Sequence, residues 1–108
     1  MTKSVKHLMV LTSCPGTITA KKVANDVVIG KLGACVQIIP GVSSFFRWGN
    51  RVDTSEELLL IIKTTADVYP ELEKRIKAIH PYEVPEIVAI PITHGLDEYL
   101  SWIDNNTV

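Results

Sequence analysis

Three observations on the 108-residue sequence predict an α+β domain. Short runs rich in β-branched and other apolar residues are bounded by Gly and Pro, as strands are. Two longer segments repeat apolar residues every three or four positions, as amphipathic helices do. The segments follow one another in the order strand, helix, strand, strand, helix, strand, which is typical of a split βαβ sandwich. Because this length suits one domain, we assign residues 1–108 to a single unit.

The first strand is predicted at His7–Thr12, a short apolar run that ends before Cys14-Pro15-Gly16. Thr17 is a suitable N-cap, so the first helix is expected to begin there and to run to about Leu32. Gly33 is placed as the helix stop, because glycine accepts the left-handed conformation that often ends a helix. The inward stripe of this helix combines Ala20, Val23, Ala24, Val27 and Val28.

The next two strands are expected to form a long hairpin. The second strand begins at Ala34–Ile39, bends at Pro40-Gly41 and continues through Val42–Trp48. Gly49-Asn50 is a turn signal that leads into a third strand, and this strand includes Glu57–Lys63.

The second helix is predicted between a cap at Asp67 and a stop at His80-Pro81, because the residue before a proline avoids the helical region. Pro70 falls in the first turn, where the missing N–H is harmless. The apolar seam of this helix consists of Tyr69, Leu72, Ile76 and Ile79.

The chain is expected to end with one more strand and a short helix. The fourth strand covers Ile87–Ile92, and Pro91 within it indicates a sheet edge or a bulge. The C-terminal helix covers Asp97–Asp104, with Leu100 and Ile103 facing inward.

The apolar pattern of the strands also predicts an oligomer. In the ferredoxin-like arrangement that this order of elements describes, two helices cover one face of an antiparallel sheet. The uncovered face should then carry polar residues in alternation. Residues 58–62 are instead apolar on both faces, and residues 87–92 are almost wholly apolar. Another copy of the chain is the simplest cover for the second face.

Composition excludes several classes of protein. A net charge of -1 gives no basic surface for nucleic acid, and no apolar run approaches the roughly 20 residues of a membrane helix. The apolar stretch Leu8–Leu11 that follows Lys3 and Lys6 is shorter than a signal-peptide core. Cys14 and Cys35 are too few for a disulfide scaffold. We therefore expect a cytoplasmic protein with reduced thiols and without nucleic-acid or membrane partners.

Two stretches carry residues suited to binding. The hairpin segment Phe45–Arg51 combines three aromatic residues with arginine, which favours a protein or ligand contact, or an arm packed on a neighbouring subunit. The loop from His80 to Glu86 is stiffened by two further prolines and also contains Tyr82. Its imidazole and carboxylate could bind a cation or a polar ligand. They could equally belong to a structural turn whose polar tips bond to the backbone.

Three further residues are candidates within the strands. Glu57 and Lys63 lie six residues apart, so a regular strand places them on one face, where they could line a pocket or pair at a subunit boundary. Cys35 suits a half-buried apolar site or, if it reaches a cleft, a soft metal such as copper. Phosphate loops, nucleophile elbows and His-x-x-x-His pairs do not occur, so we expect a binding protein and not an enzyme.

The chain also contains, in order, Leu32-Gly33-Ala34-Cys35-Val36, Ile39-Pro40-Gly41-Val42-Ser43-Ser44, Trp48, Glu57, Ile62-Lys63-Thr64, His80-Pro81-Tyr82, Pro85-Glu86-Ile87 and Tyr99-Leu100-Ser101-Trp102. These blocks, spread over residues 7–104, resemble the CutA divalent-cation tolerance family. The resemblance implies a ferredoxin-like subunit with an extended hairpin arm over residues 42–53 and a short C-terminal helix. It also implies a homotrimer similar in build to PII-type signalling proteins.

The resemblance further implies a site. Cys35 and His80 match family positions linked to metal, which implies copper or another divalent cation as the bound ion. Thr12 and Arg75 stand where some relatives carry additional cysteines, which weakens the case for clustered thiols in this chain. The expected lining of a ligand cleft between subunits is Trp48, Glu57, Lys63, Tyr82, Glu86, Tyr99 and Trp102.

Two functions therefore remain in competition. The first is a trimeric protein of divalent-metal tolerance that binds copper, another cation or a small ligand in intersubunit clefts. The second is a PII-like signalling module that senses a small anionic metabolite or a nucleotide. The sequence names no other protein partner.

Overall fold

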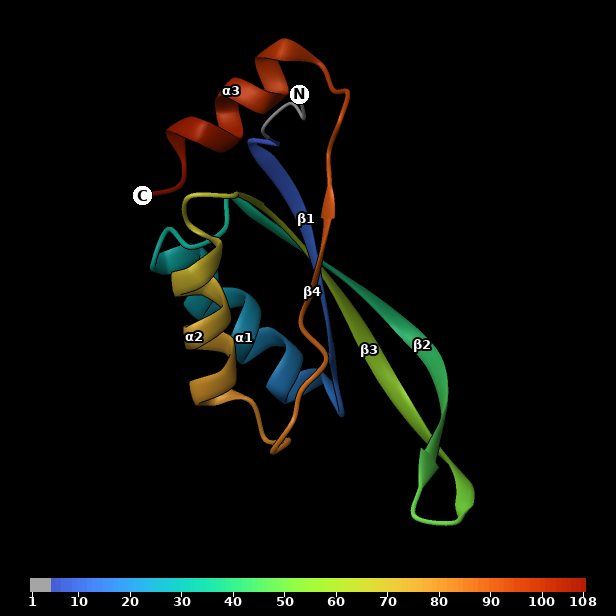
Figure 1. Cartoon of the computed structure of the whole chain (residues 1–108). Coiled ribbons are helices and arrows are strands. Elements are labelled where there is room, and N and C mark those ends of the chain that lie inside the picture. The colour runs from blue at the N-terminus through green and yellow to red at the C-terminus, as the bar shows by residue number, and fades with distance from the viewer. Residues whose placement is uncertain (1–4) are drawn as a thin grey trace.

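The computed structural model describes residues 5–108, so residues 1–4, with Lys3 among them, lie outside the described residues. Four strands form one antiparallel sheet in the order β2-β3-β1-β4 (Figure 1). The strands are β1 (His7–Cys14), β2 (Cys35–Trp48), β3 (Arg51–Thr65) and β4 (Val88–Pro91). The helices are α1 (Thr17–Ile29), α2 (Tyr69–Ile79) and α3 (Asp97–Asn105). The predicted α+β class is confirmed. Within residues 5–108, no helix is long and apolar enough to span a bilayer.

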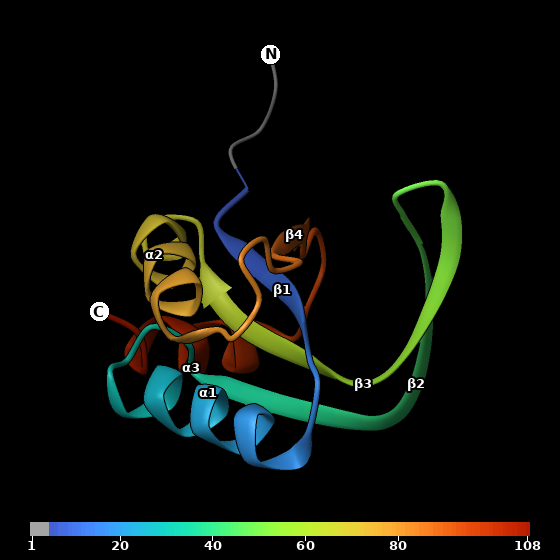
Figure 2. The ribbon, with the colours of Figure 1, turned by 90° about the horizontal axis from the view of Figure 1, so that it is seen from below.

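Helices α1 and α2 lie next to each other against the strands (Figure 2). Their inward side chains meet those of β1 and β3 in a dry core, which supplies the hydrophobic stabilisation of the chain. Val28, predicted in the inward stripe of α1, is instead 43% exposed because it lies past the edge of that stripe. The fully buried members of the core are Val10, Cys14, Ala20, Val23, Val27, Leu60, Ile62, Leu72 and Ile76.

Helix α1 ends three residues before the predicted Leu32. The N–H of Leu32 donates to the carbonyl of Val27, and the N–H of Lys31 donates to that of Val28. This bond pair is a Schellman motif, whose reversing residue takes the left-handed conformation. Lys31 occupies that position with φ 57°. The expected stop at Gly33 is therefore wrong, because Lys31 supplies the left-handed conformation that we expect of a glycine.

Gly33 has a different role, which is to allow close packing between α1 and β3. A Cβ atom added there would lie 2.6 Å from Cγ2 of Ile62 and 2.9 Å from Cγ1 of Val27. Distances this short are well inside van der Waals contact. The missing side chain thus lets the residue that enters β2 approach the core directly.

The starts of α1 and α2 also differ from prediction. Gly16, not Thr17, is the N-cap of α1, and Val68 precedes the first helical residue of α2. Asp67 therefore lies one residue too early to cap α2, and no side chain caps that end. Pro70 does occupy the first turn of α2, as predicted.

The predicted breaks within the sheet hold. β2 contains an irregularity between Ile39 and Val42, where Gly41 takes φ 75°. β4 is an edge strand, as Pro91 indicated. It is shorter at each end than the predicted Ile87–Ile92.

The face of the sheet opposite α1 and α2 is mostly apolar, and we call it the open face. Leu11 pairs with both Ile61 and Val88, and Met9 pairs with Ile90, so these side chains share one face. Because side chains alternate along a strand, this face lies opposite the core residues Val10 and Ile62. The apolar residues of the open face are Met9, Leu11, Ile39, Leu59, Ile61, Val88 and Ile90.

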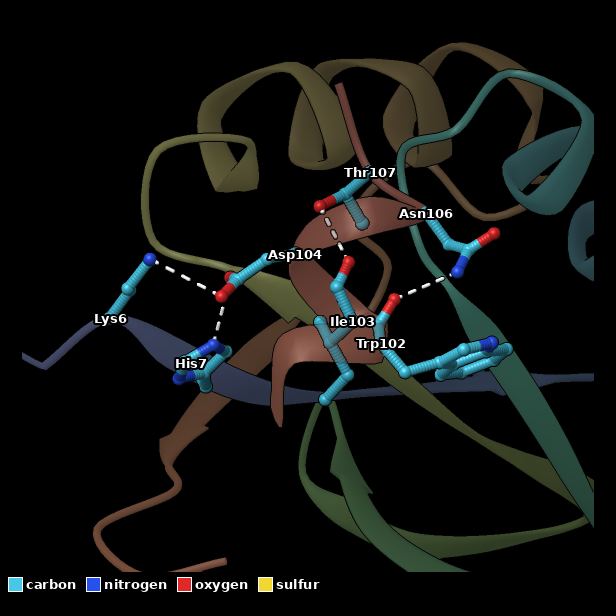
Figure 3. A network of polar contacts seen from close by, with 7 residues as sticks. All are labelled: Lys6, His7, Trp102, Ile103, Asp104, Asn106 and Thr107. Atoms are coloured by element: carbon cyan, nitrogen blue, oxygen red, sulfur yellow. Dashed lines mark hydrogen bonds and ion pairs between the residues drawn. The ribbon is translucent and has the colours of Figure 1, made fainter. Parts of the chain in front are cut away.

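Helix α3 covers one end of the open face. His7 lies three positions before Val10 on β1, so its side chain points to the opposite face, away from the core. Its Nε2–H donates to Oδ1 of Asp104 at 2.9 Å. Lys6 pairs with the same carboxylate, and Figure 3 shows both side chains converging on it. Ile103 is fully buried outside the core that α1 and α2 share. Figure 1 accordingly places α3 beside the start of β1, apart from α1 and α2.

We predict that Ile103→Ala lowers the free energy of unfolding by about 2–5 kcal/mol, because it removes a fully buried aliphatic side chain. Urea titration followed by circular dichroism measures this loss. Asn105→Ala, an exposed change on the same helix, is the control and should stay within about 0.5 kcal/mol of the wild type. Equal stability of the two variants would show that α3 is not anchored through Ile103.

Candidate functional site

The site begins where strand β1 ends. Cys14 pairs with Leu58 at the last position of β1, but β2 and β3 continue to pair with each other as far as Trp48 and Arg51. The two strands therefore form an arm that projects beyond the rest of the sheet (Figure 1). An open hollow of about 880 Å³ lies between this arm and the loop that follows α2.

The hollow is acidic. Four carboxylates line it, and no lysine or arginine among residues 5–108 does so. Glu57 is the deepest of the four, with only 7% of its surface exposed. Its Oε2 accepts a hydrogen bond of 2.8 Å from the hydroxyl of Tyr82. The carboxylates of the hollow are Asp53, Glu57, Glu83 and Glu86.

The hollow is also aromatic. Trp48 and Phe46 meet edge to face on the arm, with ring centroids 6.3 Å apart, and both line the hollow together with Phe45. Tyr82 lines it from the opposite loop. Burial and the hydrogen bond to Glu57 raise the pKa of Tyr82, so its hydroxyl keeps the proton that it donates.

His80 holds the loop that carries Tyr82. Its Nε2 lies 2.7 Å from the carbonyl oxygen of Ser13, and its Nδ1 lies 3.1 Å from the backbone nitrogen of Tyr82. A carbonyl only accepts and a backbone N–H only donates, so Nε2 carries the proton and Nδ1 supplies its lone pair. Both ring nitrogens of His80 are therefore occupied within the chain.

Cys14 is the thiol beside His80. Its sulfur lies 4.0 Å from Nε2 of His80, and the residue is fully buried. Burial and the nearby charge of Glu57 raise the pKa of the Cys14 thiol to about 11. Cys14 thus stays a neutral thiol near physiological pH.

The remaining predicted site residues gather at the α3 end of the sheet. Lys63 donates from Nζ to Oε1 of Gln37 at 2.6 Å and pairs across the sheet with Cys35. Tyr99 and Trp102 stack on α3 with ring centroids 5.7 Å apart. About six residues of β3, or roughly 20 Å, separate this group from Glu57. One chain therefore brings together Trp48, Glu57, Tyr82 and Glu86, and holds Lys63, Tyr99 and Trp102 apart from them.

Cys35 and His80 do not fit one metal site within a chain. Cys35 pairs with Lys63 on the open face, whereas His80 contacts Cys14 on the core side. The strand positions involved differ by five residues along β3, roughly 17 Å. Within residues 5–108, no three His, Cys, Asp or Glu side chains are grouped closely enough to hold an ion. His80 also has no free lone pair to offer.

Sequence reasoning missed three residues of this region. Asp53 lies four positions before Glu57, the even spacing that shares a strand face, and Glu83 directly follows Tyr82. The proximity of Cys14 to His80 has no local signal, because 66 residues separate them. Arg75 stands at a position where some relatives carry a cysteine. It donates from Nη2 to Oδ1 of Asp26 at 2.8 Å and so joins α2 to α1.

We predict that Cys14 resists alkylation in the folded protein, because its thiol is fully buried and protonated below about pH 11. Iodoacetamide labelling of a Cys35→Ser variant, followed by mass spectrometry, reports on Cys14 alone. Labelling should be slow at mildly alkaline pH and complete in concentrated urea. Rapid labelling without denaturant would contradict the burial of Cys14.

Comparison with known sequences identifies relatives along nearly the whole chain. A family profile described as CutA1 divalent ion tolerance protein matches residues 8–106. The chain is 48% identical over 99 residues to the divalent-cation tolerance protein CutA of Thermus thermophilus, covering 92% of this chain and 96% of the relative. It is 43% identical over 105 residues to the chloroplastic CutA protein of Arabidopsis thaliana. That match covers 97% of this chain but 58% of the plant protein, so the chain spans little more than half of it.

Solved structures of relatives have the same fold. The divalent cation tolerance protein of Thermus thermophilus superposes with a TM-score of 0.93 at 46% identity, covering 94% of this chain and 99% of the other. The CutA1 crystal structure from Oryza sativa gives a TM-score of 0.94 at 39% identity, covering 97% and 96%. The profile match and these identities confirm the resemblance seen in the sequence, and the chain belongs to the CutA divalent-cation tolerance family.

Proposed function

We propose that the protein forms a homotrimer that contributes to tolerance of divalent cations by binding a cation in clefts between its subunits, without catalysing a reaction. The observation that carries the cation-binding part of the proposal is Glu57, a buried carboxylate that faces an acidic hollow and has no cationic partner among residues 5–108. A charge removed from water needs a partner of opposite sign. A bound cation would supply it.

The open face supports the assembly part of the proposal. On β4, Val88 is 48% exposed and Ile90 is 42% exposed, although both lie among apolar neighbours. Ile39 on β2 is the third exposed aliphatic side chain of this group. Contiguous apolar surface of this kind is typical of an interface. A trimer that buries it would bring the arm and hollow of each chain close to its neighbours, in a ferredoxin-like particle similar in build to PII-type proteins.

We predict that Ile90→Asp disrupts the trimer, because it places a charge in the apolar interface. Sedimentation equilibrium should give three times the 12.0 kDa chain mass for the wild type and the chain mass itself for the variant. Ile18→Asp, at a side chain that is 87% exposed on α1, is the matched control and should remain a trimer. A monomeric wild type, or a trimeric Ile90→Asp variant, would refute the interface.

The charge of the hollow argues against the alternative function. A module that senses a small anion or a nucleotide needs arginine, lysine or a helix N-terminus directed at the phosphates. The hollow offers four carboxylates instead. We therefore propose cation binding and do not extend a PII-like anion-sensing function to this chain.

Copper is the metal that we propose for the tolerance function, with Cys35 as its soft ligand. Cys35 is half-buried on the face that a neighbouring chain would cover, so ligands from more than one subunit could meet there. His80 is left out of this ligand set, because both of its ring nitrogens are engaged.

We predict that Cys35→Ser weakens the binding of copper to the trimer, because it replaces a soft sulfur ligand by a hydroxyl. His80→Ala should leave the affinity for copper unchanged but lower the free energy of unfolding by about 1–3 kcal/mol, since the carbonyl of Ser13 and the N–H of Tyr82 lose their partner. Competition titration with a chromophoric chelator measures the affinity. Equal affinity of Cys35→Ser and wild type would remove Cys35 from the site.

We propose a cytoplasmic location, which suits two cysteines that form no disulfide. The name of the Arabidopsis relative places that protein in the chloroplast, so location varies among relatives. Fractionation of cells with an antibody against the chain tests the proposal. We propose neither nucleic acid nor a membrane as a partner.

A further inference from the structure

We propose that the hollow between the arm and the loop after α2 binds a small organic cation, whose ammonium or guanidinium group pairs with Glu57. This inference rests on the cation binding proposed above and names the class of ligand that this hollow takes. It concerns the hollow alone and is independent of copper at Cys35.

The first step is the state of the Glu57 carboxylate. Oε2 is bound by Tyr82, but Oε1 has no hydrogen-bond partner among the described residues. Within residues 5–108, the one buried side-chain oxygen that lacks both a partner and contact with solvent is Oγ1 of Thr12. Oε1 of Glu57 therefore remains reachable from the hollow, which Glu57 lines. One hydrogen bond from a neutral hydroxyl does not balance a buried negative charge. The hollow therefore supplies the anionic member of an ion pair, and a ligand would supply the cationic member.

The second step is the wall around that charge. Trp48, Phe46 and Tyr82 bring aromatic rings to the hollow that contains the Glu57 carboxylate. The face of an aromatic ring attracts a cation, and tryptophan does so best. A group that is both positively charged and partly apolar gains from the carboxylate and from the rings together. Alkylammonium and guanidinium groups have this chemistry, whereas a hydrated metal ion does not.

The third step is the number of available ligand side chains and the size of the hollow. A divalent metal requires several converging ligands, and no group of three or more His, Cys, Asp or Glu side chains that could hold one occurs within residues 5–108. One deep carboxylate is sufficient for an ammonium group. A volume of about 880 Å³ lies in the range of small-molecule sites and far exceeds one ion.

The outer carboxylates favour a ligand with two charges. Glu83 and Glu86 are exposed on the loop, and Asp53 is half-buried on the arm, so all three lie nearer to solvent than Glu57. A ligand with one cationic group at Glu57 can direct a second toward these side chains. The geometry thus points to a diamine or an amine that also carries a guanidinium group.

The experiment uses the full chain with a chelator present, so that metal ions make no contribution. Calorimetric titration is performed with 1,4-diaminobutane and with 1-amino-4-guanidinobutane. The matched neutral and anionic controls are 1,4-butanediol and succinate. We expect both amines to bind and to quench tryptophan fluorescence, because Trp48 lines the site, and we expect neither control to bind.

Three variants locate the binding. Glu57→Gln keeps the shape of the side chain, removes its charge and should weaken amine binding about tenfold or more. Trp48→Leu changes a residue that is 67% exposed, so it should fold normally and still weaken binding. Glu71→Gln removes an exposed carboxylate from α2, outside the hollow, and should bind like the wild type.

Failure to bind either amine, or equal affinity of wild type and Glu57→Gln, would overturn the inference. If no amine binds and the Glu57→Gln trimer dissociates more readily than the wild-type trimer, a lysine or arginine of a second copy fills the hollow. This result would also overturn the inference that a free ligand binds there. Absence of copper binding at Cys35 would refute the metal proposal alone, because the amine titration contains no metal.

Discussion

Strand β3 has apolar side chains on both faces, and the helices within residues 5–108 cover only one of them fully. Leu60 and Ile62 are fully buried beneath α1 and α2, while Leu59 and Ile61 lie on the open face. Helix α3, fixed by Ile103 and by the bonds of Asp104 to Lys6 and His7, covers the end of that face near His7. Exposed aliphatic residues on β2 and β4 remain along the rest of it. Removal of apolar surface of this kind from water is favourable, and this is the physical basis of the assembly that we propose.

Where periodicity and proline carried the signal, the sequence predicted the elements well. Leu72 and Ile76 face the core because they lie four residues apart, and Pro91 correctly indicated an edge strand. Boundaries that depend on one backbone conformation were missed. Lys31 ends α1 in the left-handed region, a position at which a sequence pattern favours glycine. Such a position is decided by the packing of Leu32 and Gly33 onto the core, which no local pattern records.

Part of the candidate site was predictable for the same reason. Glu57 and Lys63 were identified by an even spacing on one strand, and Tyr82 and Glu86 by a loop stiffened with proline. The contact of His80 with Cys14 was not, because 66 residues separate the two and because the face on which Cys14 lies depends on the register of β1 with β3. A shift of that register by one residue would turn the Cys14 thiol to the other face of the sheet. The hollow itself arises from unequal strand lengths, since the arm continues where β1 stops.

His80 links that end of the fold to the chemistry of the hollow. It closes α2, and its ring joins the end of β1 at Ser13 to the backbone of Tyr82. Tyr82 is thereby held with its hydroxyl on Glu57, and the raised pKa of that hydroxyl keeps it a donor. A buried carboxylate is tolerated only if nearby donors remain fixed, so the imidazole acts on Glu57 through the position of Tyr82. The histidine that the sequence suggested as a metal ligand therefore belongs to the support of the acidic site, and the charge that a ligand would meet is that of Glu57.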